Sequence, residues 1–119
     1  MEKQIALVTG GNKGLGKEVV RQLAKRGMTV YLGSRDAGRG EDAARSLVDE
    51  GLDVIPLRLD VTDNESVESA ASELRRVHGR LDVLVNNAGV LVSRPAFEIT
   101  GDDMKDTYVL VKRVPLQSL

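Results

Sequence analysis

Three glycines near the start of the chain have a spacing that can bind phosphate. Gly10, Gly14 and Gly16 follow the apolar run at residues 5–8 and lead into a stretch with helical periodicity. Glycine permits positive φ and close approach of a ligand, and the free N–H groups of a helix's first turn attract an anion. We expect Gly10 to turn the chain, Gly14 to let the backbone approach a pyrophosphate, and Gly16 to let the helix pack closely on its strand.

Two other interpretations of this segment stay open. Starting at Gly11, it is G-x-x-x-x-G-K, which is nearly a P-loop. A P-loop then needs a Ser or Thr hydroxyl for Mg²⁺, whereas Glu18 would put a negative charge beside the phosphates. A glycine-rich turn that binds nothing is the other alternative.

The residues at the end of the predicted strand 29–33 indicate which dinucleotide would bind. An NAD site usually has Asp or Glu there, roughly 20 residues past the glycines, to bind the ribose 2′-OH. Here Ser34 could donate to a 2′-phosphate and Arg35 could bind it bidentately. Asp36 could reach the ribose instead, and Arg35 could be a solvated surface cation. We therefore expect NADP(H) to be preferred, with NAD(H) as the alternative cofactor.

Two motifs together resemble the short-chain dehydrogenase/reductase family. They are Thr9-Gly10-x-x-x-Gly14-Leu15-Gly16 and Asn86-Asn87-Ala88-Gly89, and Gly11-Asn12-Lys13 is similar to the carbonyl-reductase branch of the family. The resemblance runs from Ile5 to about Tyr108. It implies these cofactor-binding residues: Gly10, Asn12, Lys13, Gly14, Leu15, Gly16, Ser34, Arg35, Asp60, Val61, Asn86, Ala88 and Gly89.

The resemblance also implies individual roles. Lys13 would add a second positive charge for a 2′-phosphate. Asp60 would face the adenine, with Val61 packed on the ring. Asn86 would lie against the adenosine ribose, and Gly89 would leave room for the cofactor. Two simpler readings remain: Asp60 could serve only to cap the next helix with Thr62, and Asn-Asn-Ala-Gly could be a plain turn.

The catalytic groups of the family have no convincing match. Reduction of a carbonyl by NADPH needs a proton donor, which the family supplies with a Tyr, a Lys four residues later and an orienting Ser. Tyr108 and Lys112 have that spacing, but no predicted strand separates Gly89 from Tyr108, and the nearest upstream serine is Ser93 in a loop. We interpret the match as accidental and predict no catalytic residue and no metal ligand.

The last residues also depart from the family. Residues 109–119 contain none of the family's helix with its Asn, and this loss of similarity resembles a frameshift or a fragmentary gene model. Two function classes follow: the N-terminal half of an NADP(H)-dependent oxidoreductase acting on carbonyl or alcohol substrates, or a non-catalytic dinucleotide-binding or interaction module. Another Rossmann enzyme, such as a methyltransferase, is disfavoured because Ser34 replaces the acid that would hold the ribose hydroxyls.

The elements that must position these residues alternate along the chain. We predict strands at 4–8, 29–33, 53–59 and 81–86, and helices at 13–26, 40–50 and from a Thr62/Glu65 capping box to Gly79, then a short helix at 101–111. This alternation predicts an α/β fold of Rossmann type, truncated, with helices on both faces of a four-stranded parallel sheet in the order 3-2-1-4. Pro56 favours an edge position for the third strand. The fourth strand would have an uncovered edge through which the chain could dimerise or aggregate.

Composition limits the partners. The chain has 119 residues, 29% charged and 41% hydrophobic, which fits one domain over residues 1–119. A net charge of −1 gives no basic field for nucleic acid or membranes, and the lack of cysteine excludes disulfides and thiolate metal sites. No apolar run is long enough for a membrane span, and the first strand starts too early for a signal peptide to precede it. We expect a cytoplasmic protein.

Overall fold

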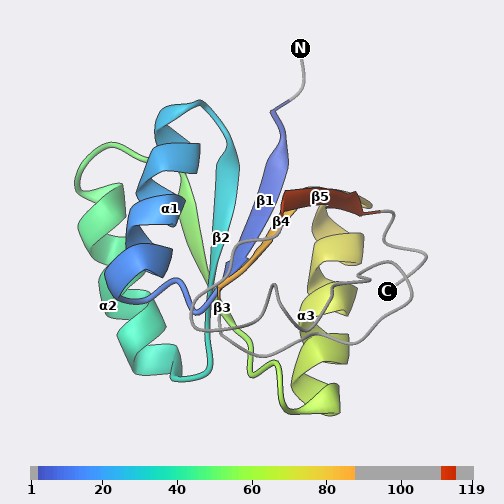
Figure 1. Cartoon of the computed structure of the whole chain (residues 1–119). Helices are drawn as coiled ribbons and strands as arrows, with labels where there is room; N and C mark the ends of the chain where they lie inside the picture. Colours follow the sequence, from blue (N-terminus) through green and yellow to red (C-terminus); the bar gives the residue numbers. More distant parts are fainter. Residues whose placement is uncertain (1–2, 88–110, 115–119) are drawn as a thin grey trace, which may run out of the picture.

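The computed structural model describes residues 3–87 and 111–114, the last four by their backbone alone (Figure 1). Its elements in chain order are β1 (Ile5–Thr9), α1 (Gly14–Lys25), β2 (Thr29–Ser34), α2 (Ala37–Val48), β3 (Val54–Arg58), α3 (Asn64–Val77), β4 (Leu81–Asn86) and β5 (Val111–Val114). Four parallel strands lie in the order β3-β2-β1-β4, and β5 extends the sheet antiparallel to β4. The predicted fold class and the order of the parallel strands are confirmed, whereas the fifth strand was not predicted.

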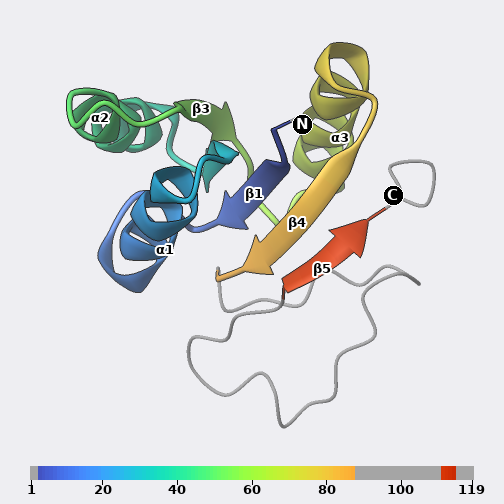
Figure 2. The same cartoon turned by 90° about the horizontal axis from the view of Figure 1, so that it is seen from above.

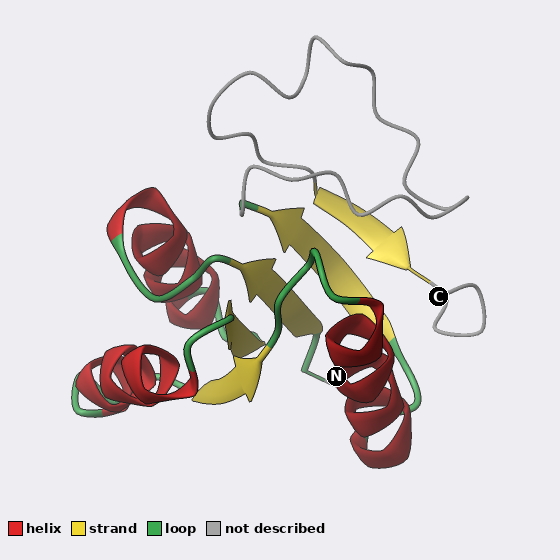
Figure 3. Ribbon diagram, turned by 90° about the horizontal axis from the view of Figure 1, so that it is seen from below, coloured by secondary structure: helices red, strands yellow, loops and turns green. Residues whose placement is uncertain are grey.

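Helices cover both faces of the sheet, as predicted. Figures 1 and 3 show α1 and α2 on one face and α3 on the other. Because side chains alternate along a strand, the strand residues divide between two cores. Val8 and Leu32 belong to the core under α1 and α2, and Leu7 and Tyr31 belong to the core under α3. No helix among the described residues has the length and apolar character that crossing a membrane requires.

The edge strand β3 tolerates Pro56 for a specific reason. The Leu59 N–H donates to Ser34 O, and the Val30 N–H donates to Asp53 O. Because successive backbone groups of a strand point in opposite directions, the nitrogen of Pro56 faces away from β2. The proline therefore breaks no bond of the sheet and removes a donor from its open edge.

Helix α2 begins at Ala37, three residues before the predicted start at residue 40. Asp36 is its N-cap and accepts a hydrogen bond of 3.0 Å from the Arg39 N–H. Gly40 serves close packing, since a Cβ there would lie 2.9 Å from the Cβ of Ser34. Near the end of this helix the side chain of Val48 is 49% exposed.

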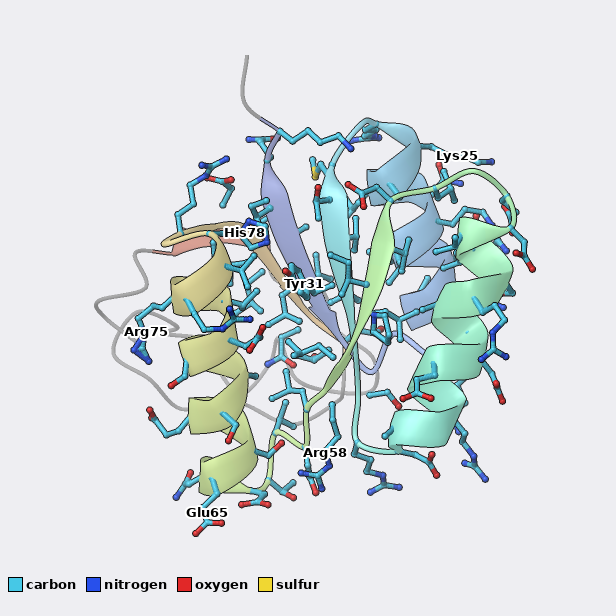
Figure 4. The ribbon with its side chains drawn as sticks, turned by 180° about the vertical axis from the view of Figure 1, so that it is seen from behind. Lys25, Tyr31, Arg58, Glu65, Arg75 and His78 are labelled. Carbon is cyan, nitrogen blue, oxygen red and sulfur yellow. The ribbon has the colours of Figure 1, made fainter. Side chains whose placement is uncertain are left out.

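The predicted capping box of α3 is wrong. Asp63 is the N-cap and accepts from the Glu65 N–H at 3.0 Å, whereas the Thr62 hydroxyl already donates to Asp60 Oδ1 at 2.6 Å. The far end of α3 is tied to the sheet by the Tyr31 hydroxyl, which lies 2.7 Å from His78 Nε2, and Figure 4 shows the two side chains facing each other.

The prediction of an uncovered β4 edge is also wrong. Strand β5 pairs with it, placing Val111 opposite Val85 and Lys112 opposite Leu84, with an irregularity between Leu81 and Leu84 (Figure 2). Of the helix predicted at 101–111, residues 101–110 lie outside the described residues and Val111 begins β5. Unpaired backbone groups on a buried apolar edge are costly, and a β-branched segment of the same chain satisfies them.

Deleting residues 111–119 should expose this edge. We expect the shortened protein to dimerise or aggregate in sedimentation velocity and to melt at a lower temperature, because β4 would then offer unpaired N–H and C=O groups. A chain lacking only residues 115–119 is the matched control and should behave as wild type. A monomeric 111–119 deletion with unchanged melting would contradict the role assigned to β5.

Candidate functional site

A cleft of about 500 Å³ lies beyond the carboxyl ends of the parallel strands, within the size range of small-ligand sites. Among the described residues, those lining it are Gly10, Asn12, Lys13, Gly14, Leu15, Arg35, Leu59, Asp60, Val61, Thr62 and Asn87. The loops after β1, β2, β3 and β4 all contribute. The structure thus brings most of the predicted cofactor residues of the described ranges together at one edge of the sheet.

The glycine turn after β1 has the predicted geometry. Gly10 and Gly14 have φ values of 63° and 58°, a region that favours glycine. A Cβ on Gly14 would meet nothing within 4 Å, so the backbone is open to a ligand there. A Cβ on Gly16 would lie 2.2 Å from Gly10 O and 2.3 Å from Asn87 Nδ2. Gly16 is therefore required for the close packing of α1 on the turn.

The start of α1 can receive an anion. Lys13 is the N-cap residue, no side chain caps the helix, and no acid lies in its first turn. The free N–H groups and the positive end of the helix dipole therefore face the cleft without a competing carboxylate from the helix itself. Beside them the side chain of Leu15 is 54% exposed, an apolar surface that a bound ligand would cover.

The two asparagines at the end of β4, Asn86 and Asn87, have different roles. Asn86 is buried, and its Oδ1 accepts a hydrogen bond from the Thr9 hydroxyl at 2.9 Å, so this side chain ties β4 to β1. It is not among the residues that line the cleft, whereas the resemblance had implied a place against the adenosine ribose. Asn87, which sequence reasoning did not select, lines the cleft and donates from Nδ2 to Gly10 O at 3.1 Å. Its buried Oδ1 has no partner among the described residues. The sequence could have indicated this role, because side chains alternate along a strand and a buried Asn86 therefore turns the side chain of Asn87 outward.

The end of β2 also differs from the prediction. Ser34 is 2% exposed, does not line the cleft and donates its hydroxyl to Asp36 O at 2.9 Å. The pleat turns Ser34 toward Gly40 on α2, so its geometry does not support the predicted bond to a 2′-phosphate. Arg35 does line the cleft. Asp36, the alternative ribose ligand, is engaged as the N-cap of α2.

Asp60 is an acceptor at the cleft. Its Oδ1 accepts from the Thr62 hydroxyl at 2.6 Å and from the Thr62 N–H at 3.0 Å. These bonds, with smaller effects from the charges of Arg58 and Arg35, hold the pKa of Asp60 below its usual value. The carboxylate is therefore ionised at neutral pH and can only accept hydrogen bonds. Since Asp63 caps α3, the reading in which Asp60 and Thr62 only cap that helix is wrong.

Two predicted residues, Ala88 and Gly89, lie outside the described residues, as does Tyr108. Lys112 lies in β5, where its backbone is paired opposite Leu84. Within the described ranges, no group of His, Asp and Glu side chains has the arrangement of a metal site.

Comparisons with known proteins agree on one family. Residues 4–111 match the family described as short chain dehydrogenase. Carbonyl reductase [NADPH] 1 of Bos taurus is 46% identical over 87 residues, which cover 72% of this chain and 31% of that protein. Menthone neomenthol reductase from Mentha piperita superposes with a TM-score of 0.72 at 44% identity, over 76% of this chain and 33% of that one. A metagenomic short-chain oxidoreductase solved in complex with NADP gives a TM-score of 0.68 at 36% identity, over 73% of this chain and 39% of that one. The chain therefore spans less than half the length of each of these relatives.

Replacing Gly16 by Ala should destabilise the protein by about 1–3 kcal/mol, because the new Cβ would overlap backbone and a packed amide that have little room to move. Gly38→Ala is the matched control in α2, where a Cβ would meet only Asp36 Oδ1 at 3.5 Å. Urea unfolding followed by circular dichroism measures both. Equal midpoints for the two variants would contradict the packing role of Gly16.

Proposed function

The chain belongs to the short-chain dehydrogenase family, and on that premise we propose that its cleft binds NADP(H) in preference to NAD(H). The observation that carries this preference is the pair of cations, Lys13 and Arg35, that line the cleft. The acid closest in sequence to them, Asp36, is held at the start of α2. A 2′-phosphate would meet positive charge at this end of the cleft, and Arg35 can bind it bidentately. Two relatives whose names state NADPH or NADP support the same cofactor.

The other cleft residues fit the remaining parts of such a dinucleotide. The open backbone at Gly14 and the uncapped start of α1 suit the pyrophosphate. Asp60, an ionised acceptor, suits the amino group of an adenine, and Val61 supplies apolar surface for the ring. Leu15 would be covered by the ligand. Contacts of Ala88 and Gly89 with the cofactor remain a prediction from the resemblance.

We propose that this chain supplies the nucleotide-binding part of an oxidoreductase that reduces carbonyl groups, and that by itself it does not turn over. When bound, NADPH would supply the hydride, while the residues of the cleft bind and orient the cofactor. A proton donor for the carbonyl oxygen is also needed. No tyrosine or histidine lines the cleft in the part of the chain that the structure describes, and Lys112 lies in an extended strand. The extended backbone at Lys112 favours the interpretation of the Tyr108 and Lys112 spacing as accidental.

A non-catalytic dinucleotide-binding module is the second candidate. It is favoured by the same observation, a cleft that can hold a nucleotide but has no tyrosine or histidine among its described lining residues. The two candidates share the cofactor and differ in whether a carbonyl substrate is ever reduced.

Titration calorimetry tests the cofactor. We expect NADPH to bind more tightly than NADH, and Arg35→Ala to weaken NADPH about tenfold and NADH much less, because one charge-assisted contact to the 2′-phosphate is lost. Arg75→Ala, an exposed position on α3 outside the cleft, is the matched control. Equal affinities of the wild-type protein for the two cofactors would contradict the proposal.

Turnover is tested with NADPH and a panel of aldehydes and ketones. We expect no oxidation of NADPH above background, and no change in the Tyr108→Phe variant, because the pair lacks the context of a proton relay. Robust oxidation by the wild-type chain that disappears in Tyr108→Phe would show that Tyr108 is the proton donor after all.

A further inference from the structure

The turn between β3 and α3 contains Asp60, the acceptor that the cleft offers to a nucleotide base. The Asp63 N–H donates to Asp60 O at 3.0 Å and closes this turn. Figure 4 shows the two flanks of the turn, Arg58 at the end of β3 and Glu65 in the first turn of α3, at the same end of the molecule. The backbone of Asp60 therefore decides where its carboxylate lies in the cleft.

The backbone N–H of Asp60 finds its partner on a helix. The Leu59 N–H donates to Ser34 O on β2, and because successive backbone groups point in opposite directions, the Asp60 N–H points away from β2. Strand β3 is the edge of the described sheet, so that side offers no further strand. The hydroxyl of Ser66 on α3 accepts a hydrogen bond from this N–H at 2.8 Å instead.

Ser66 is buried although it lies in the first turn of a helix on the surface of the molecule. Only 5% of it is exposed, and it shares the buried face of α3 with Ala70, four residues later. A buried N–H that loses its acceptor is costly, so the bond from Asp60 to Ser66 constrains the turn. Ser72 on the same helix is exposed.

The carboxylate of Asp60 is held at one of its two oxygens. Oδ1 accepts from the Thr62 hydroxyl at 2.6 Å and from the Thr62 N–H at 3.0 Å. No residue that the structure describes donates a hydrogen bond to Oδ2. One oxygen is therefore fixed by the turn, and the other remains for a ligand in the cleft that Asp60 lines.

We propose that Ser66 is a positioning residue for recognition of the base. By holding the Asp60 N–H, it fixes the carboxylate where the exocyclic amino group of an adenine would donate to Oδ2. The inference rests on the NADP(H) binding proposed above. Ser66 is not among the residues that line the cleft, so it acts through Asp60 and does not touch the ligand. Without this bond the turn is free to rotate at the end of β3, and the bonds from Thr62 to Oδ1 weaken.

The test compares NADPH with its hypoxanthine analogue, in which an oxygen replaces the 6-amino group. The ratio of the two dissociation constants, measured by titration calorimetry, reports recognition of the base, whereas a general loss of stability weakens both ligands alike. Ser66→Ala removes the acceptor of the Asp60 N–H. Ser72→Ala is the matched control, because it makes the same change at an exposed position of α3.

We expect the wild-type protein to bind NADPH at least about tenfold more tightly than the analogue, because the carboxylate accepts from an amino group and repels an oxygen. Ser66→Ala should bring this ratio toward one, and Ser72→Ala should leave it unchanged. In an Asp60→Ala background, Ser66→Ala should change the ratio no further, because a residue that acts through Asp60 then has nothing to position.

A second readout needs no dinucleotide. The hydrogen bonds from Thr62 hold the pKa of Asp60 below its usual value. A carboxylate that has moved away from Thr62 loses this stabilisation, so NMR titration of the free protein should give Asp60 a higher pKa in Ser66→Ala than in the wild type or Ser72→Ala. Should Ser66→Ala not fold, Ser66→Cys replaces it, because a thiol fills the site but is a weak acceptor.

The proposal is overturned if the nucleotide ratio or the pKa of Asp60 stays at its wild-type value when Ser66 is replaced, or if Ser72→Ala changes both as strongly. A wild-type protein that binds the two nucleotides equally well also overturns it, and leaves the proposed NADP(H) binding standing. A wild-type protein that binds neither nucleotide contradicts the proposed function and, with it, the role of Ser66 in base recognition.

Discussion

The contact between the glycine turn, the start of α1 and the end of β4 is the constraint on which the rest of the cleft depends. Gly16 packs so closely on Gly10 O and Asn87 Nδ2 that no Cβ fits between them. From the other side, the Thr9 hydroxyl donates to Asn86 and accepts from the Asn87 N–H at 2.9 Å. These contacts join the ends of two strands 77 or 78 positions apart in sequence. The turn therefore keeps the backbone geometry that an anion needs at the start of α1.

The pleat of the strands decides which polar residues reach the cleft. At the ends of β2 and β4 two polar residues follow one another, and in each pair the first is buried and the second lines the cleft. Ser34 and Asn86 consequently stabilise the sheet and the first turn of α2, while Arg35 and Asn87 are left for a ligand. The charged side chains of this region are also divided between the cleft and the fold. Arg35 and Lys13 line the cleft, whereas the carboxylate of Asp36 caps α2.

The two edges of the sheet are protected by different means. On β3 the nitrogen of Pro56 takes the place of an outward donor, so this edge offers fewer groups for pairing with another chain. On β4 the backbone is covered by β5, which runs antiparallel and so needs no crossover helix. The nucleotide-binding half of the fold is thus closed at one edge by a short strand of its own chain.

The sequence by itself determined the fold class, the order of the parallel strands and most of the cleft. Apolar runs alternating with amphipathic helices leave few topologies, and the glycine spacing after β1 is a local pattern that already indicates a turn with positive φ. Only the tertiary structure decided that Asp63 and not Thr62 caps α3, that Ser34 and Asn86 are buried, and that β5 covers β4. Each of these depends on which face of an element a side chain occupies or on a partner far away in the chain. Spacing along the sequence does not contain that information, because it is created when the helices and strands pack.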